Sequence, residues 1–320
     1  MIPSPLGVGR HLLSAFAVFA ALAVPSTAEN LDYIHHGDVI YGRKYGMALT
    51  MEIFRPKENS NGIGIVSVLS GGWYSSHPEN PAAARSAALL DAGYTVFAVT
   101  HGSQPKFSIP EILDDVHRAV RFIRFHAADY GINPDRIGIT GASAGGHLSL
   151  MQGTAGDLGN PKAKDPIDRV SSRVQAVACF FPPTDFLNYG KPDENAIGRG
   201  ILWNYSGAFG FTNFDPDWRR LVPITDEAKI REIGECISPI THVSADDPPT
   251  LIFHGDKDWL VPLQQSETIV ERLKAAGVET ELIVKPGADH GWPGMGEDTK
   301  TITHWFEKHL VTTPSASAAR

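Results

Sequence analysis

The sequence has few cysteines, no excess of positive charge and few charged residues for its length. Only two of its 320 residues are cysteine, Cys179 and Cys236, and neither has the partner spacing of a zinc site. The pair could be two buried free thiols or one disulfide, and the sequence favours neither over the other. The formal net charge of −8 gives no reason to expect binding to nucleic acid or to an anionic membrane surface.

The chain also lacks a long apolar run beyond its first residues. Arg10 and His11 precede an apolar segment at residues 12–24, and the small residues that follow Pro25 end in Ala28. This order is typical of a secretory signal peptide, whereas an uncleaved anchor would need a longer run. We therefore expect residues 1–28 to be removed, the protein to be secreted or periplasmic, and no membrane span to remain.

Strand-like and helix-like segments alternate along the rest of the chain. Strands are predicted at residues 47–54, 63–69, 94–99, 136–140, 174–181, 250–254 and 279–284, and helices at residues 81–92, 109–130, 144–151, 263–276 and 299–310. Alternation of this kind predicts an α/β fold, with a mostly parallel sheet and helices on both faces. One domain is expected over residues 29–311, followed by a disordered tail at residues 312–320.

One region interrupts this alternation. Residues 188–235 contain no clear strand or helix pattern but are rich in aromatic side chains, among them Trp203, Tyr205, Phe209, Phe211, Phe214 and Trp218. An insertion that only packs on the main body would bury these rings, and so would a cap that covers a substrate pocket. The two interpretations are compatible, and we expect a cap.

A nucleophile motif follows one of the predicted strands. Residues 141–145 read Gly-Ala-Ser-Ala-Gly, which fits the Gly-x-Ser-x-Gly pattern. The pattern alone is weak, because 31 of the 320 residues are glycine and a glycine-rich connector could match it. Here a strand enters the motif and a helix leaves it, as a nucleophile elbow requires. Ser143 is therefore the candidate nucleophile, with the N–H of Ala144 placed at the start of the helix.

A base and an acid for this serine follow later strands. Asp256 and Asp258 come just after the strand at residues 250–254, and His290 follows the strand at residues 279–284. The carboxyl ends of parallel strands meet at one edge of a sheet, where sites form in open α/β folds. His290 is the candidate base, and the residues alone leave Asp256 and Asp258 open as the acid.

A second oxyanion donor is expected after the first buried strand. Ser70-Gly71-Gly72-Trp73 lies at that position, and its glycines let backbone N–H groups face a substrate without an intervening Cβ. We expect the N–H of Gly72 or of Trp73 to act together with that of Ala144.

These segments together resemble the esterase and lipase branch of the α/β-hydrolase superfamily. They are most similar to the bacterial secreted acetyl esterase and feruloyl-esterase-like (BD-FAE-like) proteins. The likeness runs from about residue 40 to residue 310 without the aromatic insertion, and rests on residues 70–73, 115–121, 130–137, 141–147, 254–258, 261–262 and 290–291. It implies an α/β-hydrolase fold. It also implies that the second aspartate of His-Gly-x-x-Asp-x-x-Val-Pro, Asp258, is the catalytic acid, and that His147 and Asp115 are structural.

Two positions depart from the pattern of these relatives. Ser70 stands where they usually have the histidine of His-Gly-Gly, so the support of the oxyanion loop is expected to differ. His101-Gly102-Ser103 stands where they often have Asn-Tyr-Arg. This position is expected to border the pocket and to affect specificity.

The resemblance and the candidate residues point to a carboxylic ester hydrolase that forms an acyl-enzyme on Ser143, with His290 and Asp258, and needs no cofactor or metal. Export and family likeness suggest a small-molecule or polysaccharide-linked ester, such as an acetylated or feruloylated plant polysaccharide. Two alternatives are a prolyl-oligopeptidase-type peptidase, which usually carries a large propeller domain, and a non-catalytic binding protein, which typically lacks a triad residue. Nothing in the residues indicates an oligomeric state.

Overall fold

The computed structural model describes residues 33–75 and 86–311. The predicted signal peptide at residues 1–28, the predicted tail at residues 312–320 and the first part of the predicted helix at residues 81–92 lie outside these residues.

The main sheet has eight strands in the order β1-β2-β4-β3-β5-β6-β9-β10. The strands are β1 (Tyr33–Lys44), β2 (Met47–Pro56), β3 (Gly64–Val68), β4 (Thr95–Val99), β5 (Ile137–Ala142), β6 (Ala176–Phe180), β9 (Thr250–Gly255) and β10 (Thr280–Lys285). The six strands from β4 to β10 in this order are parallel, whereas β1 pairs with β2, and β2 with β4, in antiparallel fashion. The prediction of a mostly parallel α/β sheet is confirmed, and each predicted strand agrees with the structure within two residues.

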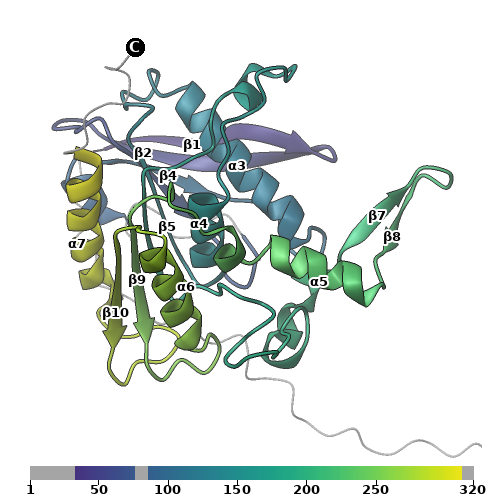
Figure 1. Cartoon of the computed structure of the whole chain (residues 1–320). Helices are drawn as coiled ribbons and strands as arrows, with labels where there is room; N and C mark the ends of the chain where they lie inside the picture. Colours follow the sequence, from purple (N-terminus) through teal and green to yellow (C-terminus); the bar gives the residue numbers. More distant parts are fainter. Residues whose placement is uncertain (1–32, 76–85, 312–320) are drawn as a thin grey trace, which may run out of the picture.

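Helices cover both faces of this sheet (Figure 1). One face packs against α3 (Ile109–Phe125), α4 (Ala144–Thr154) and α6 (Gln264–Ala275), and the other against α2 (Ala87–Asp91) and α7 (Met295–Phe306). Because successive side chains of a strand point to opposite faces, neighbours in one strand enter different cores. In β3, for example, Val66 packs with α3 and α4, while Ile65 packs with the α7 side. Because helices pack on both faces of the sheet, the ends of its strands are held in fixed positions.

Two helices differ in length or position from the sequence prediction. The predicted helix at residues 109–130 ends at Phe125, and turns continue to Gly131, whose φ is +66°. The apolar pattern continues because Ala127 remains buried, although the backbone is no longer helical. The last helix, predicted from residue 299, begins at Met295 after Gly294 in a left-handed conformation, and its final turn (η5, Glu307–Val311) is π-helical.

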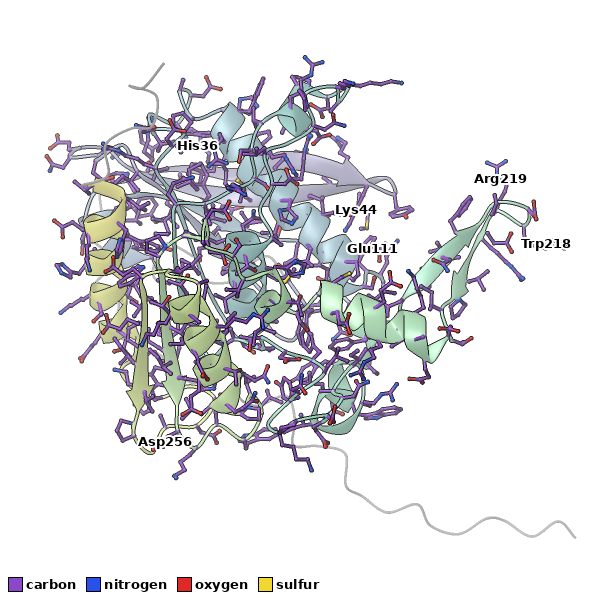
Figure 2. All side chains as sticks on the ribbon, in the orientation of Figure 1. His36, Lys44, Glu111, Trp218, Arg219 and Asp256 are labelled. Atoms are coloured by element: carbon purple, nitrogen blue, oxygen red, sulfur yellow. The ribbon has the colours of Figure 1, made fainter. Side chains whose placement is uncertain are left out.

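The aromatic insertion at residues 188–235 contains four short elements. They are the 3₁₀ segment η3 (Gly200–Phe209), the hairpin strands β7 (Thr212–Asp215) and β8 (Arg220–Pro223), and α5 (Glu227–Cys236). The hairpin projects away from the main sheet, with Trp218 and Arg219 at its tip (Figures 1 and 2). Its large apolar side chains are exposed, and Trp218 is 75% accessible. The insertion therefore has an outer part that covers no described pocket and an inner part, η3, that packs on the main body.

The two cysteines are not joined. Cys179 lies in β6 and is buried, whereas Cys236 ends α5 and is exposed. Of the two arrangements left open by the sequence, the disulfide is absent, and only one of the two free thiols is buried.

Candidate active site

Ser143 lies on a sharp turn between β5 and α4. Its φ of +55° and ψ of −121° are unusual for a residue with a side chain. The strand and helix approach each other closely here, because a Cβ on Gly141 would lie 2.4 Å from the carbonyl oxygen of Gly145. A Cβ on Gly145 would lie 2.7 Å from the carbonyl oxygen of Val68 in β3. Both glycines of the motif are thus required by backbone contacts, which hold Ser143 at the apex of the turn.

Ser143, His290 and Asp258 form one chain of hydrogen bonds. The Oγ of Ser143 lies 2.9 Å from Nε2 of His290, and Nδ1 of His290 lies 2.7 Å from Oδ2 of Asp258. An ionised carboxylate can only accept, so Nδ1 carries the imidazole proton in this arrangement. Nε2 is then free to accept the proton of the serine hydroxyl. The structure therefore brings together the three residues that the sequence placed after β5, β9 and β10.

Asp258 is held in its ionised form. Its Oδ1 accepts the backbone N–H groups of Leu260 at 2.9 Å and of Val261 at 2.8 Å. Burial acts to raise the pKa of Asp258, but hydrogen bonds from His254 and His290 outweigh it and lower the pKa to about 2. The carboxylate is therefore charged at any pH near neutrality and can stabilise an imidazolium at His290.

Asp256, the other candidate acid, has a different position. Its Oδ1 accepts the backbone N–H of Gly287 at 2.7 Å, which ties the loop after β9 to the loop after β10. Figure 2 shows Asp256 at the end of β9. Asp258, not Asp256, is therefore the carboxylate that contacts the imidazole ring of His290.

Gly71 to Tyr74 form a tight turn beside Ser143. Gly71 and Tyr74 exchange two backbone hydrogen bonds of 3.0 Å, and the two central residues, Gly72 and Trp73, have φ of +56° and +58°. Positive φ at both central positions is the mark of a type I′ turn. The N–H groups of Gly72 and Trp73 donate to no acceptor in the described part of the chain. They are available to a ligand, as is required of oxyanion donors.

The Trp73 side chain anchors this turn to the protein interior. Its indole N–H donates to Nδ1 of His147 at 3.1 Å, and its ring packs edge-on against Phe209 of η3. Burial lowers the pKa of His147 to about 4, so the ring is neutral and its Nε2–H donates to the carbonyl of Ile237 at 2.7 Å. The backbone N–H of His147 donates to the backbone carbonyl of Ser143 at 2.9 Å, so the anchor is also connected to the turn that carries the nucleophile.

Asp115 and His101 lie around the loop after β4. Asp115 accepts hydrogen bonds from Nζ of Lys44 at 2.6 Å and from the backbone N–H of Gly102 at 2.8 Å. It thereby connects α3 to β1 and to this loop. His101 is buried, and burial lowers its pKa to about 4.

Two aromatic rings of the insertion, those of Tyr205 and Phe209, lie against the Gly71–Tyr74 turn. The ring of Tyr205 lies on Gly72, where a Cβ would come within 2.4 Å of its Cε1 atom. Phe209 lies on Trp73. Their only signal in the sequence was the unusual aromatic content of the segment, which does not show which ring faces the site.

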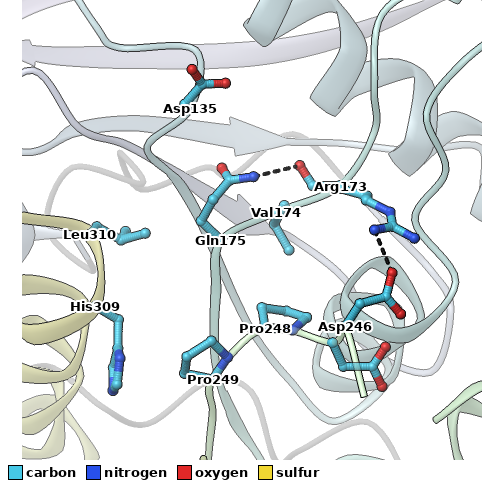
Figure 3. A pocket seen from close by; sticks show the side chains of 10 residues that line it. Asp135, Arg173, Val174, Gln175, Asp246, Pro248, Pro249, His309 and Leu310 are labelled. Atoms are coloured by element: carbon cyan, nitrogen blue, oxygen red, sulfur yellow. Dashed lines mark hydrogen bonds and ion pairs between the residues drawn. The ribbon is translucent and has the colours of Figure 1, made fainter. Parts of the chain in front are cut away.

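Two cavities lie elsewhere on the molecule. One of about 390 Å³ is lined by Arg173, Asp246, His309 and neighbouring residues, and Arg173 forms an ion pair of 2.6 Å with Asp246 (Figure 3). The other, of about 750 Å³, lies between β1, α3 and residues 165–168. Neither is lined by Ser143, Asp258 or His290.

Within residues 33–75 and 86–311, no group of three or more His, Cys, Asp or Glu side chains could hold a metal ion. No helix in this part of the chain is long and apolar enough to cross a bilayer.

Comparison with known proteins assigns the family. The BD-FAE family matches residues 51–273, more than half of the chain. The chain belongs to the BD-FAE family. This confirms the resemblance seen in the sequence and agrees with the α/β-hydrolase fold.

Individual relatives of this chain are named as esterases. "Probable carboxylic ester hydrolase LipM" of Mycobacterium tuberculosis is 29% identical over 83% of this chain and 58% of that protein. "Esterase LipQ" of the same organism is 25% identical over 71% of this chain and 50% of that protein. The chain thus spans between half and three fifths of the length of these curated relatives.

A solved structure covers more of both chains. A "truncated form of carbohydrate esterase from gut microbiota" is 27% identical, with a TM-score of 0.69 over 89% of this chain and 99% of that chain.

Proposed function

We propose that this protein is a carboxylic ester hydrolase that acts through an acyl-enzyme on Ser143. The observation that carries the proposal is the chain of hydrogen bonds from Ser143 through His290 to the ionised Asp258. The esterase names of the relatives support it.

In the first half of the proposed reaction, Ser143 Oγ attacks the carbonyl carbon of the ester while its proton passes to Nε2 of His290. Asp258 stabilises the imidazolium through Nδ1. The carbonyl oxygen becomes an oxyanion, and the N–H of Ala144 and an N–H of the Gly71–Tyr74 turn donate to it. The tetrahedral intermediate then collapses, and the leaving alcohol takes the proton from His290.

In the second half, water attacks the acyl-enzyme and gives a proton to Nε2 of His290. The second oxyanion is held by the same backbone donors. Its collapse releases the carboxylic acid and returns the proton to Ser143 Oγ. Because both halves use the same groups, the proposal assigns no step to a cofactor.

For the substrate, we propose an acetyl or feruloyl ester, either in a small molecule or on a polysaccharide, and we propose that the protein is exported. The name of the carbohydrate esterase structure supports the first part, and the signal-like pattern at residues 1–28 supports the second. A screen of aryl esters with acyl chains of increasing length, together with acetylated and feruloylated xylan, tests the substrate. Amino-terminal sequencing of the exported protein tests cleavage after Ala28.

Replacement of the nucleophile tests the proposed reaction. We expect Ser143→Ala to fold normally and to lose at least about 10³-fold in kcat on a short-chain aryl ester, because no nucleophile remains. Wild-type turnover by the folded variant would contradict the mechanism. Comparison of matched ester and amide substrates with the wild-type protein separates an esterase from a peptidase.

A further inference from the structure

The loop after β4 holds the Gly71–Tyr74 turn by its backbone. The side-chain Nε2 of Gln104 donates to the carbonyl of Gly72 at 3.1 Å, and the backbone N–H of Gln104 donates to the carbonyl of Trp73 at 3.1 Å. The hydroxyl of Ser103 exchanges two hydrogen bonds of 2.8 Å with the backbone of Ser75. Gln104 therefore holds the turn itself through two hydrogen bonds, and Ser103 holds Ser75, the residue after the turn, through two others.

One of these bonds controls the direction of an oxyanion donor. The carbonyl of Gly72 and the N–H of Trp73 belong to the same planar trans peptide, in which they point in opposite directions. A donor that fixes the carbonyl therefore also fixes the N–H. The amide nitrogen of Gln104 must face Gly72, because a carbonyl oxygen only accepts hydrogen bonds.

We propose that Gln104 is a positioning residue that aims the N–H of Trp73 at the oxyanion, and this inference rests on the proposed function of Ser143. It concerns the N–H of Trp73, one of the two donors that the sequence left open; the N–H of Gly72 belongs to the peptide whose carbonyl, that of Gly71, accepts the N–H of Tyr74. Gln104 acts on the peptide from the carbonyl side, so it orients the donor without touching the substrate.

Gln104 is itself held in place by the insertion. A Cβ on Gly207 of η3 would lie only 2.4 Å from Oε1 of Gln104 and 2.7 Å from Cβ of Pro105. The amide of Gln104 is thus confined between η3 and the turn, while Tyr205 of η3 lies on Gly72. A donor whose direction is fixed before substrate binds needs no reorganisation during the reaction.

This arrangement accounts for the departure at Ser70. The Oγ atom of Ser70 is buried and has no hydrogen-bond partner in the described part of the chain. The side chain at position 70 therefore does not brace the turn. Gln104 supplies that support from a neighbouring strand end, whereas Ser103 holds Ser75, the residue after the turn.

The test replaces the side-chain donor and keeps the backbone. Gln104→Met has nearly the same length but cannot donate to Gly72. We expect its kcat on an aryl acetate to fall about 10- to 100-fold with KM within about twofold, because an oxyanion donor contributes mainly to the transition state. We expect Ki for an aryl trifluoromethyl ketone, which forms a tetrahedral oxyanion on serine, to rise by the same factor as kcat/KM falls. Circular dichroism checks that the fold is retained.

Ser103→Ala is the matched control. It removes two hydrogen bonds from the same loop, but they hold Ser75 and not the peptide that carries the Trp73 N–H. We expect kcat to change less than about threefold. An unchanged kcat in Gln104→Met, or an equal loss in both variants, would overturn the role of Gln104 while leaving Ser143 as the nucleophile. Wild-type turnover that does not depend on Ser143 would overturn both proposals.

Discussion

Asp258 accepts hydrogen bonds on both carboxylate oxygens, and this distinguishes it from Asp256 two residues earlier. Replacement by asparagine preserves its size but removes the charge and offers His290 an amide in place of a carboxylate. We expect Asp258→Asn to lower kcat about 10⁴-fold, because the imidazole loses the partner that fixes its tautomer and stabilises its charged form. Steady-state kinetics with an aryl ester measure the loss.

Asp256→Asn provides the control at this loop. The amide oxygen of asparagine can still accept the N–H of Gly287, so we expect kcat within about threefold of wild type. A loss in Asp256→Asn comparable with that in Asp258→Asn would contradict the assignment of the acid.

At the residue scale, the sequence predicted those site residues that directly follow a strand. Ser143, Asp258 and His290 each come just after a parallel strand, so their local pattern already indicates one edge of the sheet. Asp256 and Asp258 share a loop, and only the fold shows which one faces His290. Gln104 had no signal, because its contact with Gly72 depends on how two loops from different strands approach each other.

The elbow between β5 and α4 depends on the absence of side chains at its glycines. In Gly141→Ala, the new Cβ would lie 2.4 Å from the carbonyl oxygen of Gly145, and the backbone there cannot move without shifting α4. We expect the free energy of unfolding to fall by about 2 kcal/mol or more. Urea unfolding followed by circular dichroism measures the change.

Gly296→Ala is the matched substitution in a helix. Nothing lies within 4 Å of a Cβ at this position in α7. Alanine is the better helix former, so we expect stability to be unchanged or to rise by up to about 1 kcal/mol. Equal stabilities of the two variants would show that the elbow is not closely packed.

At the element scale, regular amphipathic segments were predictable, and the short strands inside the insertion were not. The buried strands carry clear apolar runs, so their limits agree closely with the structure. The strands β7 and β8 have exposed residues on both faces, and therefore lack the alternation by which a half-buried strand is recognised. The end of α3 was placed too late because Ala127 continues the apolar pattern in a non-helical turn.

In the whole molecule, the inner part of the aromatic insertion, η3, packs beside the candidate site, and its outer part, the hairpin β7–β8, projects into solvent. The hairpin β7–β8 starts after Phe211 and returns at Ile224, whose N–H donates to the carbonyl of Phe211 at 2.9 Å. Replacement of residues 212–223 by a short Gly-Ser linker would therefore leave η3 in place. We expect the melting temperature to stay within about 3 °C and kcat/KM on a small aryl ester within about twofold, because most of the removed side chains are exposed and none is fully buried.

Melting curves and kinetics of this deletion variant test whether the hairpin is independent of the candidate site. A loss of more than tenfold in kcat/KM would show that the hairpin contributes to the site and that the whole insertion acts as a cap. At this scale the sequence predicted the α/β sheet and an aromatic insertion near the pocket. It did not predict that the outer half would project away, because aromatic content alone does not show what covers a ring.

Covalent labelling tests the central role of Ser143 most directly. The protein is treated with a fluorophosphonate, which loses fluoride when an activated serine attacks phosphorus, and the labelled peptide is identified by mass spectrometry. We predict one label per chain, on the peptide that contains Ser143, and none in Ser143→Ala. An unlabelled Ser143 in protein that hydrolyses esters, or a stoichiometric label on another residue, would contradict the account.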